Sequence, residues 1–207
     1  AVLGTFEVRS VDGEIASWTS RKARELLKIL VARRGAPIAR EEMMSLLWPD
    51  DQPDELANRL AVAVSTVRRA LDPSRSLPAD EILRAEGGSL QLLANHIDVD
   101  VETFLRAAKA SLDAHHADSP DALALLQGAL ATYGGEALPD EPYESWAESL
   151  RSETSSTRNA LLRVVSARAS DTGDHLLASD ALRLLLEQDP YDEQANLGFI
   201  DVLHKLG

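Results

Sequence analysis

The sequence has no cysteine and no long run of apolar residues. The absence of cysteine among the 207 residues excludes a disulfide framework and thiolate metal sites. The apolar run at residues 26–32 is interrupted by Lys28 and is far too short to cross a bilayer. Since it shows neither a transmembrane span nor a secretory signal, we expect a globular cytoplasmic protein with one large or two small domains.

An overall excess of basic residues is also missing. The chain holds 21 Lys and Arg against 34 Asp and Glu, a net charge of −13, which taken whole argues against binding nucleic acid. The acidity is uneven, however: residues 1–100 hold 13 basic and 16 acidic residues, and residues 101–207 hold 8 and 18. Residues 21–40 carry seven basic residues and a single acid, Glu25. Because local potential governs the approach of phosphate, the first half stays a candidate for DNA binding and the second does not.

Motifs for catalysis and metal binding are absent as well. The sequence has no glycine-rich phosphate loop, no GxSxG elbow and no HExxH. His115 and His116 are adjacent, so on a helix their side chains point ~100° apart and do not easily share a metal. The sequence therefore predicts no catalytic residue, no metal site and no cofactor, and a protein that is not an enzyme.

Residues 54–71 are the stretch around which the rest is organised, because they predict one amphipathic helix. At 100° per residue, an apolar stripe lies on one side, formed by Leu56, Leu60, Ala63, Val64, Val67 and Leu71. The opposite side carries Asn58, Val62, Ser65, Thr66 and Arg69, with Arg59 and Arg68 on the flanks. Short hydrogen-bonding groups beside guanidinium groups suit a helix that reads base edges in a major groove. A solvated helix has the same pattern, so the neighbouring segments must decide.

The neighbouring segments have the order of a winged helix-turn-helix. We expect strands within residues 2–18 with a turn at Asp12 and Gly13, helices at 21–34 and 40–47, an acidic loop at 48–53 and a hairpin at 82–93. Trp48 is expected in the core, and Asp54 is expected to cap the helix that follows. Strands, three helices and a closing hairpin predict an OmpR-like winged-helix domain over residues 1–96.

The second half predicts an all-α, TPR-like domain over residues 97–207. Its expected helices are at 101–114, 120–133, 145–169, 174–188 and 191–206. Small residues at Ala178 and Ala181, with Pro190 before the next helix, are typical of a TPR-like helix pair. Such repeats stack and usually end in a cap, so we expect this domain to be truncated and the natural chain to continue. The aromatic residues Tyr133, Tyr143 and Trp146 are expected to pack in this domain, with a ligand pocket among them as the alternative.

Several motifs also carry a family resemblance. They are SRKA at residues 20–23, IAREE at 38–42, LLWP at 46–49, STVRRAL at 65–71 and IDVD at 97–100. Together they resemble the SARP (antibiotic regulatory protein) transcriptional activators, in which an OmpR-like winged helix precedes a bacterial transcriptional activation domain. The resemblance implies binding to promoter repeats as tandem copies, and recruitment of RNA polymerase through the loop before the recognition helix. Thr66 and Leu90 depart from the family pattern at positions that bear on DNA contacts.

The helix faces and the resemblance together give an expected role to each polar residue of the first half. The bases would be contacted by Asn58, Ser65, Thr66 and Arg69. The phosphates would be bound by Arg21, Lys22, Arg40, Arg59 and Arg68. Arg84, beside the wing tip at Gly87 and Gly88, would enter the minor groove. Asp50 and Asp51 would face RNA polymerase. For any single arginine, a solvated position or an internal ion pair is the alternative.

The sequence therefore predicts a two-domain transcriptional activator that is mainly α with small β-sheets. Its expected partners are double-stranded promoter DNA, RNA polymerase and, on DNA, a second copy of the chain, and no membrane. Two alternatives remain open. One is a protein-interaction module of a larger signalling ATPase, and the other is a small-molecule sensor that uses the helical domain as its pocket.

Overall fold

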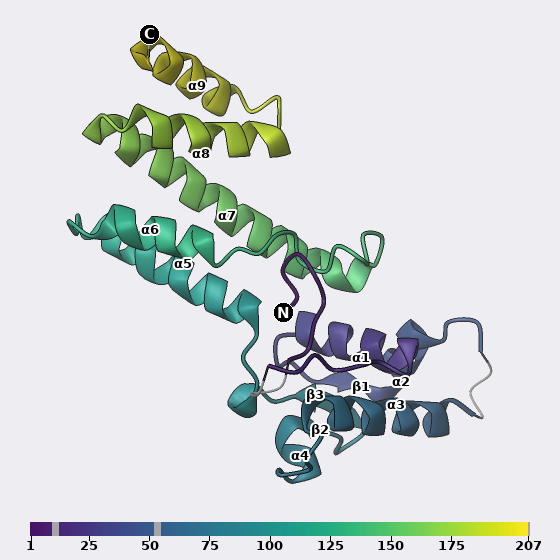
Figure 1. The fold of residues 1–207 in the computed structure, drawn as a ribbon. Helices are drawn as coiled ribbons and strands as arrows, with labels where there is room; N and C mark the ends of the chain where they lie inside the picture. Colours follow the sequence, from purple (N-terminus) through teal and green to yellow (C-terminus); the bar gives the residue numbers. More distant parts are fainter. Residues whose placement is uncertain (10–12, 52–54, 207) are drawn as a thin grey trace. The chain divides into compact units, whose positions relative to one another are not determined.

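The computed structural model describes residues 1–9, 13–51 and 55–206, and it is mainly helical with a small three-stranded sheet, as the sequence predicts (Figure 1). It divides into two compact units. Residues 1–99 and 137–150 form the first unit, and residues 100–136 with those from 151 onward form the second. None of the helices in the described ranges is both long and apolar enough to cross a membrane.

Three helices make the core of the first unit: α1 (Arg21–Ala32), α2 (Arg40–Leu47) and α3 (Leu56–Leu71). Ser20 caps α1, because its side chain accepts a hydrogen bond from the Ala23 backbone N–H at 3.2 Å. The helix ends before Gly35, whose φ of 79° only glycine adopts without strain. The predicted apolar stripe of α3 is buried apart from the half-buried Leu71. The predicted helices are thus confirmed, while the expected cap at Asp54 lies outside the described residues.

A three-stranded antiparallel sheet completes the winged helix. Its strands are β1 (Ile38–Ala39), β2 (Leu83–Arg84) and β3 (Ser89–Leu92), in the order β1-β3-β2. Ile38 pairs with Leu90 and Leu83 with Leu92, and all four side chains are buried against the helices. β2 and β3 are the predicted hairpin. A short helix α4 (Ala79–Ile82) and a 3-10 turn η2 (Ala94–His96) flank it, each too short for a periodic pattern to predict.

The strands predicted within residues 2–18 are wrong for the described part of that segment. Residues 1–9 and 13–18 form only isolated bridges, Leu3 with Ala137 and Arg9 with Ile15, and Asp12 of the predicted turn lies outside the described residues. The apolar residues Val2, Leu3 and Phe6 of this segment are buried nevertheless, since each is at most 7% exposed. The main partner of the segment comes from far along the chain: the Leu138 N–H donates to the Val2 carbonyl at 2.9 Å. A local pattern cannot show that pairing.

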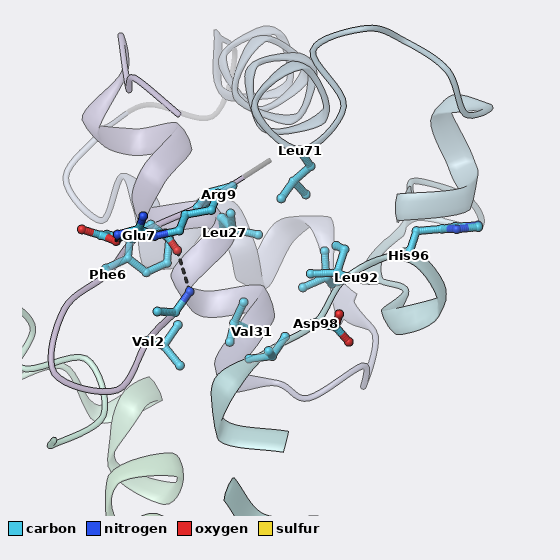
Figure 2. Close-up of a pocket in the computed structure, with 14 residues that line it drawn as sticks. Val2, Phe6, Glu7, Arg9, Leu27, Val31, Leu71, Leu92, His96 and Asp98 are labelled. Atoms are coloured by element: carbon cyan, nitrogen blue, oxygen red, sulfur yellow. Dashed lines mark hydrogen bonds and ion pairs between the residues drawn. The ribbon is translucent and has the colours of Figure 1, made fainter. Parts of the chain in front are cut away.

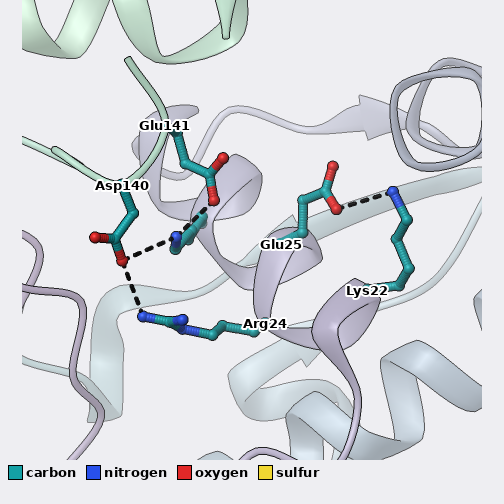
Figure 3. Close-up of polar contacts among 6 residues, drawn as sticks. Lys22, Arg24, Glu25, Asp140 and Glu141 are labelled. Carbon is teal, nitrogen blue, oxygen red and sulfur yellow. Dashed lines mark hydrogen bonds and ion pairs between the residues drawn. The ribbon is translucent and has the colours of Figure 1, made fainter. Parts of the chain in front are cut away.

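Residues 137–141, which we call the acidic strap, bring carboxylates from the second half of the sequence onto α1 (Figure 3). Lys28 Nζ lies 2.6 Å from Glu141 Oε1 and 3.7 Å from Asp140 Oδ2, and Arg24 Nη2 lies 3.1 Å from Asp140 Oδ2. The Lys28 side chain is 2% exposed, with its ammonium also 5.3 Å from the centre of the Phe6 ring. Because an unpaired buried ammonium costs several kcal/mol, the strap compensates a charge that α1 carries in its buried face.

The second unit is helical throughout its described residues, as predicted. Its helices are α5 (Asp100–His116), α6 (Ala122–Ala131), α7 (Ser145–Thr172), α8 (His175–Gln188) and α9 (Glu193–Leu206), with residues 145–150 of α7 assigned to the first unit. Ala178 and Ala181 are buried, and a Cβ on Gly198 of α9 would lie 3.3 Å from Leu182 Cδ2 of α8. Small residues therefore let α8 and α9 approach closely, as expected of a TPR-like pair.

The aromatic residues of the second half differ in their surroundings. The Tyr133 ring packs 5.1 Å from the Phe104 ring, with the Arg158 guanidinium 5.3 Å from its centre, which confirms a packing role. Burial raises the pKa of the Tyr133 hydroxyl. Tyr143, in contrast, is 97% exposed, so the prediction that it packs is wrong. It follows the proline of an acidic loop rather than lying within a periodic helix. Trp146 and Trp48 are half-buried.

Candidate nucleic-acid interface

The outer face of α3 is open to solvent. Asn58, Ser65 and Arg69 are exposed, and Val62 between them is 65% exposed, while Leu60 and Val67 on the opposite face are fully buried. Thr66 is half-buried, and its hydroxyl donates to the Val62 carbonyl at 2.9 Å. Of the four predicted base-facing residues, three thus present their polar groups freely, and Thr66 uses its proton within the helix.

The three arginines of α3 have different partners. Arg69 has no carboxylate within ion-pair distance in the part of the chain that the structure describes. Arg59 lies 2.5 Å from Asp51 and 3.6 Å from Glu55. Arg59 is therefore already neutralised by neighbouring acids, whereas Arg69 carries a free positive charge.

Arg68 connects α3 to the wing. Its Nε and Nη2 donate to the Leu83 carbonyl at 3.2 Å and 2.7 Å, and Nη2 lies 2.5 Å from Asp80 Oδ1. The side chain is 27% exposed. These bonds hold the start of β2 against α3, so Arg68 has a structural role that the helix pattern does not predict. Its role as a phosphate ligand stays a prediction.

The predicted phosphate ligands of α1 and α2 lie near the starts of their helices. Arg21 is exposed in the first turn of α1 and has no ionic partner among the described residues. Lys22 lies 3.0 Å from Glu25, as Figure 3 shows. Arg40 is half-buried, and its backbone N–H donates to the Gly88 carbonyl at 3.0 Å, which ties the start of α2 to the wing tip.

The wing tip is exposed and built on glycine. Gly87 and Gly88 have φ of 60° and 76°, in the left-handed region predicted for the turn, and a Cβ on either would meet no atom within 4 Å. Arg84 is exposed on β2. The tip is therefore sterically free to approach a ligand, with one basic side chain beside it.

Residues 48–51 of the loop between α2 and α3 hold two exposed carboxylates, one of which is paired. Asp50 is exposed, whereas Asp51 pairs with Arg59. Asp54 lies outside the described residues. The pairing of Asp51 ties the loop to α3 and leaves Asp50 as the residue there that is open to a partner.

Two of the hollows among the described residues of this unit differ in character. One, of about 330 Å³, lies between the N-terminal segment, α1 and residues 96–99 (Figure 2). Its wall is apolar at Val2, Leu27 and Leu92. Two of its charged side chains, Glu7 and Arg9, pair with each other at 2.6 Å, and Asp98 also lines it. The other, of about 490 Å³, lies beside the C-terminal half of α3. It borders Arg75, a residue that the sequence pattern left in an unassigned polar loop.

No site for a metal ion is built in the described ranges. No group of three or more histidine or acidic side chains there is close enough to hold an ion. The His115 and His116 rings lie 5.5 Å apart at an angle of 44°.

Two family models match the sequence. The Bacterial transcriptional activator domain matches residues 99–207, and the model described as Transcriptional regulatory protein, C terminal matches residues 16–88. The structure is similar to that of Mycobacterium tuberculosis EmbR in complex with low affinity phosphopeptide, with a TM-score of 0.76 and 21% sequence identity. The match covers 95% of this chain and 52% of that one, so this chain spans about half the length of the protein it resembles. Among curated proteins, no sequence matches.

Proposed function

This chain belongs to the family of the bacterial transcriptional activator domain, and on that premise we propose that it is a sequence-specific activator that binds promoter DNA through its winged helix. The two matching families contain transcriptional regulators rather than enzymes, and the order of an OmpR-like winged helix before the activator domain is that of SARP-type regulators. Residues 1–96 would bind DNA, and residues 97–207 would mediate activation and pairing of two copies. Such a regulator would work in the cytoplasm, where the promoter is.

The observation that carries the proposal is the division of α3 into a buried and an exposed face. Asn58, Ser65 and Arg69 project from the exposed face of a helix that packs against α1, α2 and α4. Arg69 is a free guanidinium in the described structure, so it meets no internal competitor for a guanine edge. Thr66 is better placed to accept a hydrogen bond than to donate one, since its proton is used. α3 alone would thus read few bases.

Backbone contacts would supply the rest of the affinity. Arg21 and Arg84 are exposed without ionic partners in the described residues, and Arg40 stands next to the wing tip. Arg59 and Arg68 would have to exchange an internal carboxylate for a phosphate, so they would add less. Because phosphate contacts release counterions, affinity would fall steeply as salt rises.

A binding assay with a matched pair of variants tests the proposal. Arg69→Ala is compared with Arg106→Ala, an exposed arginine of α5 without an ionic partner in the described ranges. By fluorescence anisotropy with cognate promoter DNA, Arg69→Ala should lose about 1–3 kcal/mol of binding free energy, roughly 5- to 150-fold in Kd. Arg106→Ala should bind like the unmodified chain. Equal binding by both variants would show that α3 does not lie in the groove. If the unmodified chain does not bind DNA even at low salt, the proposal that it is an activator is wrong and a protein-interaction module is favoured.

Contact with RNA polymerase has its own readout. The acidic loop before α3 would meet a basic polymerase surface through Asp50, while Asp51 is held by Arg59. In a reconstituted transcription assay, Asp50→Asn should lower activated transcription without changing Kd for the promoter. Full activation by this variant would exclude Asp50 from the contact.

A further inference from the structure

The lining of the hollow beside α3 includes three arginines and a serine next to apolar residues of α3, the turn and α4. The hollow has a volume of about 490 Å³ and lies between the C-terminal half of α3, the turn at residues 72–78 and α4. Ser65, Arg68 and Arg69 border it from α3, and Asp72 and Arg75 border it from the turn. The guanidinium groups on one side of this concave surface are donors of the kind that bind an oxyanion.

The single carboxylate of its lining is occupied by the turn itself. Asp72 Oδ2 accepts from the Leu77 N–H at 2.9 Å, and Oδ1 accepts from the Ser76 N–H at 3.0 Å and from the Ser74 and Ser76 hydroxyls at 3.1 Å and 3.2 Å. The hydrogen bond from Leu77, the largest of several causes, lowers the pKa of Asp72 below its ordinary 3.8. Asp72 therefore stays ionised at neutral pH, and both of its carboxylate oxygens accept hydrogen bonds from within the turn.

The same turn places Arg75 at the hollow. Arg75 has a φ of 54°, in the left-handed region, and its N–H donates to the Asp72 carbonyl at 3.2 Å. Outside glycine this conformation is uncommon and persists where surrounding contacts impose it. The hydrogen bonds of Asp72 are such contacts, so the direction of Arg75 is set by the turn.

Two of the three arginines at the hollow are free to bind an anion. Arg68 is held by Asp80 and the Leu83 carbonyl. Arg69 and Arg75 are exposed and have no carboxylate within ion-pair distance in the described ranges. Since Arg69 is proposed to face the bases, the Arg75 guanidinium of the turn is the group left to donate to the oxygens of a phosphate.

The position of the hollow indicates which phosphate it takes. Ser65 and Arg69 belong both to its border and to the exposed face of α3 proposed to read bases. When a helix lies in a major groove, a sugar–phosphate strand runs along each flank of it. We propose that this hollow binds a backbone phosphate of the promoter, with Arg75 as its ligand and Asp72 as the positioning residue. This rests on the proposed DNA binding and adds a contact that fixes how α3 sits in the groove.

Arg75→Ala provides the first test, with Arg106→Ala as the matched control. Arg75→Ala should weaken binding to cognate and to unrelated duplexes alike, by about tenfold, because a phosphate contact carries no sequence information. The slope of log Kd against log salt should fall by about one. If the unmodified chain binds DNA and Arg75→Ala keeps both the affinity and the salt slope, the proposed phosphate contact at the hollow is wrong, while the proposed function stands. If the unmodified chain does not bind, the proposed function fails first.

Asp72→Asn tests positioning, because two explanations predict opposite signs. A carboxylate that merely stands near DNA repels it, so its removal would tighten binding. If Asp72 orients Arg75, Asp72→Asn should weaken binding, and adding it to Arg75→Ala should cause no further loss. Circular dichroism and Tm of each variant confirm that the fold is retained. Tighter binding by Asp72→Asn would overturn the positioning role.

Inorganic phosphate separates a DNA site from a site for a free anion. At matched ionic strength, replacing chloride by phosphate should change the Tm of the unmodified chain and that of Arg75→Ala by the same amount. A phosphate-dependent rise in Tm that Arg75→Ala abolishes, together with unchanged DNA affinity of that variant, would assign the hollow to a free anion and overturn the proposal.

Discussion

The arginines around α3 differ in what holds their guanidinium groups, and this decides what each can do. Arg68 is bound to groups 12 and 15 residues further along the chain, Asp80 and the Leu83 carbonyl. Arg69 and Arg75 have no such partners in the described residues. The helix pattern in the sequence predicts the direction of each side chain but not the group with which it pairs. Arg68 and Arg69 look alike in the sequence, but Arg68 is held within the fold, whereas Arg69 is the one proposed to bind DNA.

This difference predicts that removing the Arg68 side chain lowers the stability of the fold, whereas removing that of Arg69 does not. Arg68→Ala removes two hydrogen bonds to a partly buried carbonyl, so it should lower the free energy of unfolding by about 1–3 kcal/mol. Arg69→Ala should leave that free energy within about 0.5 kcal/mol of the unmodified chain. Urea denaturation followed by circular dichroism measures both. An unchanged midpoint for Arg68→Ala would show that its bonds to β2 do not stabilise the wing.

At the level of elements, the sequence predicts what local patterns determine. α2 has the expected bounds, and α3, α8 and the β2–β3 hairpin match to within a few residues, because an apolar period, a cap or a glycine pair marks each. The N-terminal strands are wrong because Val2 and Leu3 pair with residues 137 and 138, a partner that no local period reveals. The exposed face of α3 follows from the pattern, whereas the hollow beside it depends on how Asp72 folds the turn.

The glycines of two elements make a matched prediction. Gly88 in the wing and Gly128 in α6 both have open space where a Cβ would lie, but only Gly88 has a positive φ. Gly88→Ala should therefore destabilise the fold by about 1 kcal/mol through backbone strain. Gly128→Ala should stabilise it by about 0.5–1 kcal/mol, since alanine favours the helix.

Chemical denaturation of the two glycine variants checks the sign of each effect. Because the added Cβ meets no atom within 4 Å at either position, the difference in stability between the two variants reports backbone conformation alone. Gly88→Ala should also weaken binding to any duplex if the wing touches DNA, while Gly128→Ala should not. A stabilising Gly88→Ala would mean that the tip does not hold its left-handed turn in solution.

At the scale of the whole molecule, the acidic strap makes the winged helix depend on the second half of the sequence. The Lys28 ammonium is 2% exposed and its nearest carboxylate, Glu141, lies 113 positions away. The helix pattern places Lys28 only as an interruption in an apolar stripe, and it cannot show what neutralises it. Any fragment that ends before residue 137 leaves this charge without Asp140 and Glu141.

A double-mutant cycle tests the strap. Glu141→Gln should lower the free energy of unfolding by about 3 kcal/mol, because it leaves a buried ammonium with only the more distant Asp140. Lys28→Met combined with Glu141→Gln should recover most of that loss, since no buried charge remains. Lys109→Met, in an exposed pair with Asp113, serves as the control and should change stability by less than about 1 kcal/mol. Equal losses from Glu141→Gln and Lys109→Met would show that the strap contributes no more than a surface ion pair.

The course of the chain between its two units bears on how such a protein can vary over time. The backbone passes from one unit to the other after residues 99, 136 and 150 rather than once. A recombination event at a single point near residue 99 would join a new helical half to an old winged helix and bring with it a foreign strap. Lys28 and Glu141 would then have to be inherited together, or change together. The two units are each compact, but the two halves of the sequence cannot be exchanged freely, because residues 137–150 of the second half belong to the first unit.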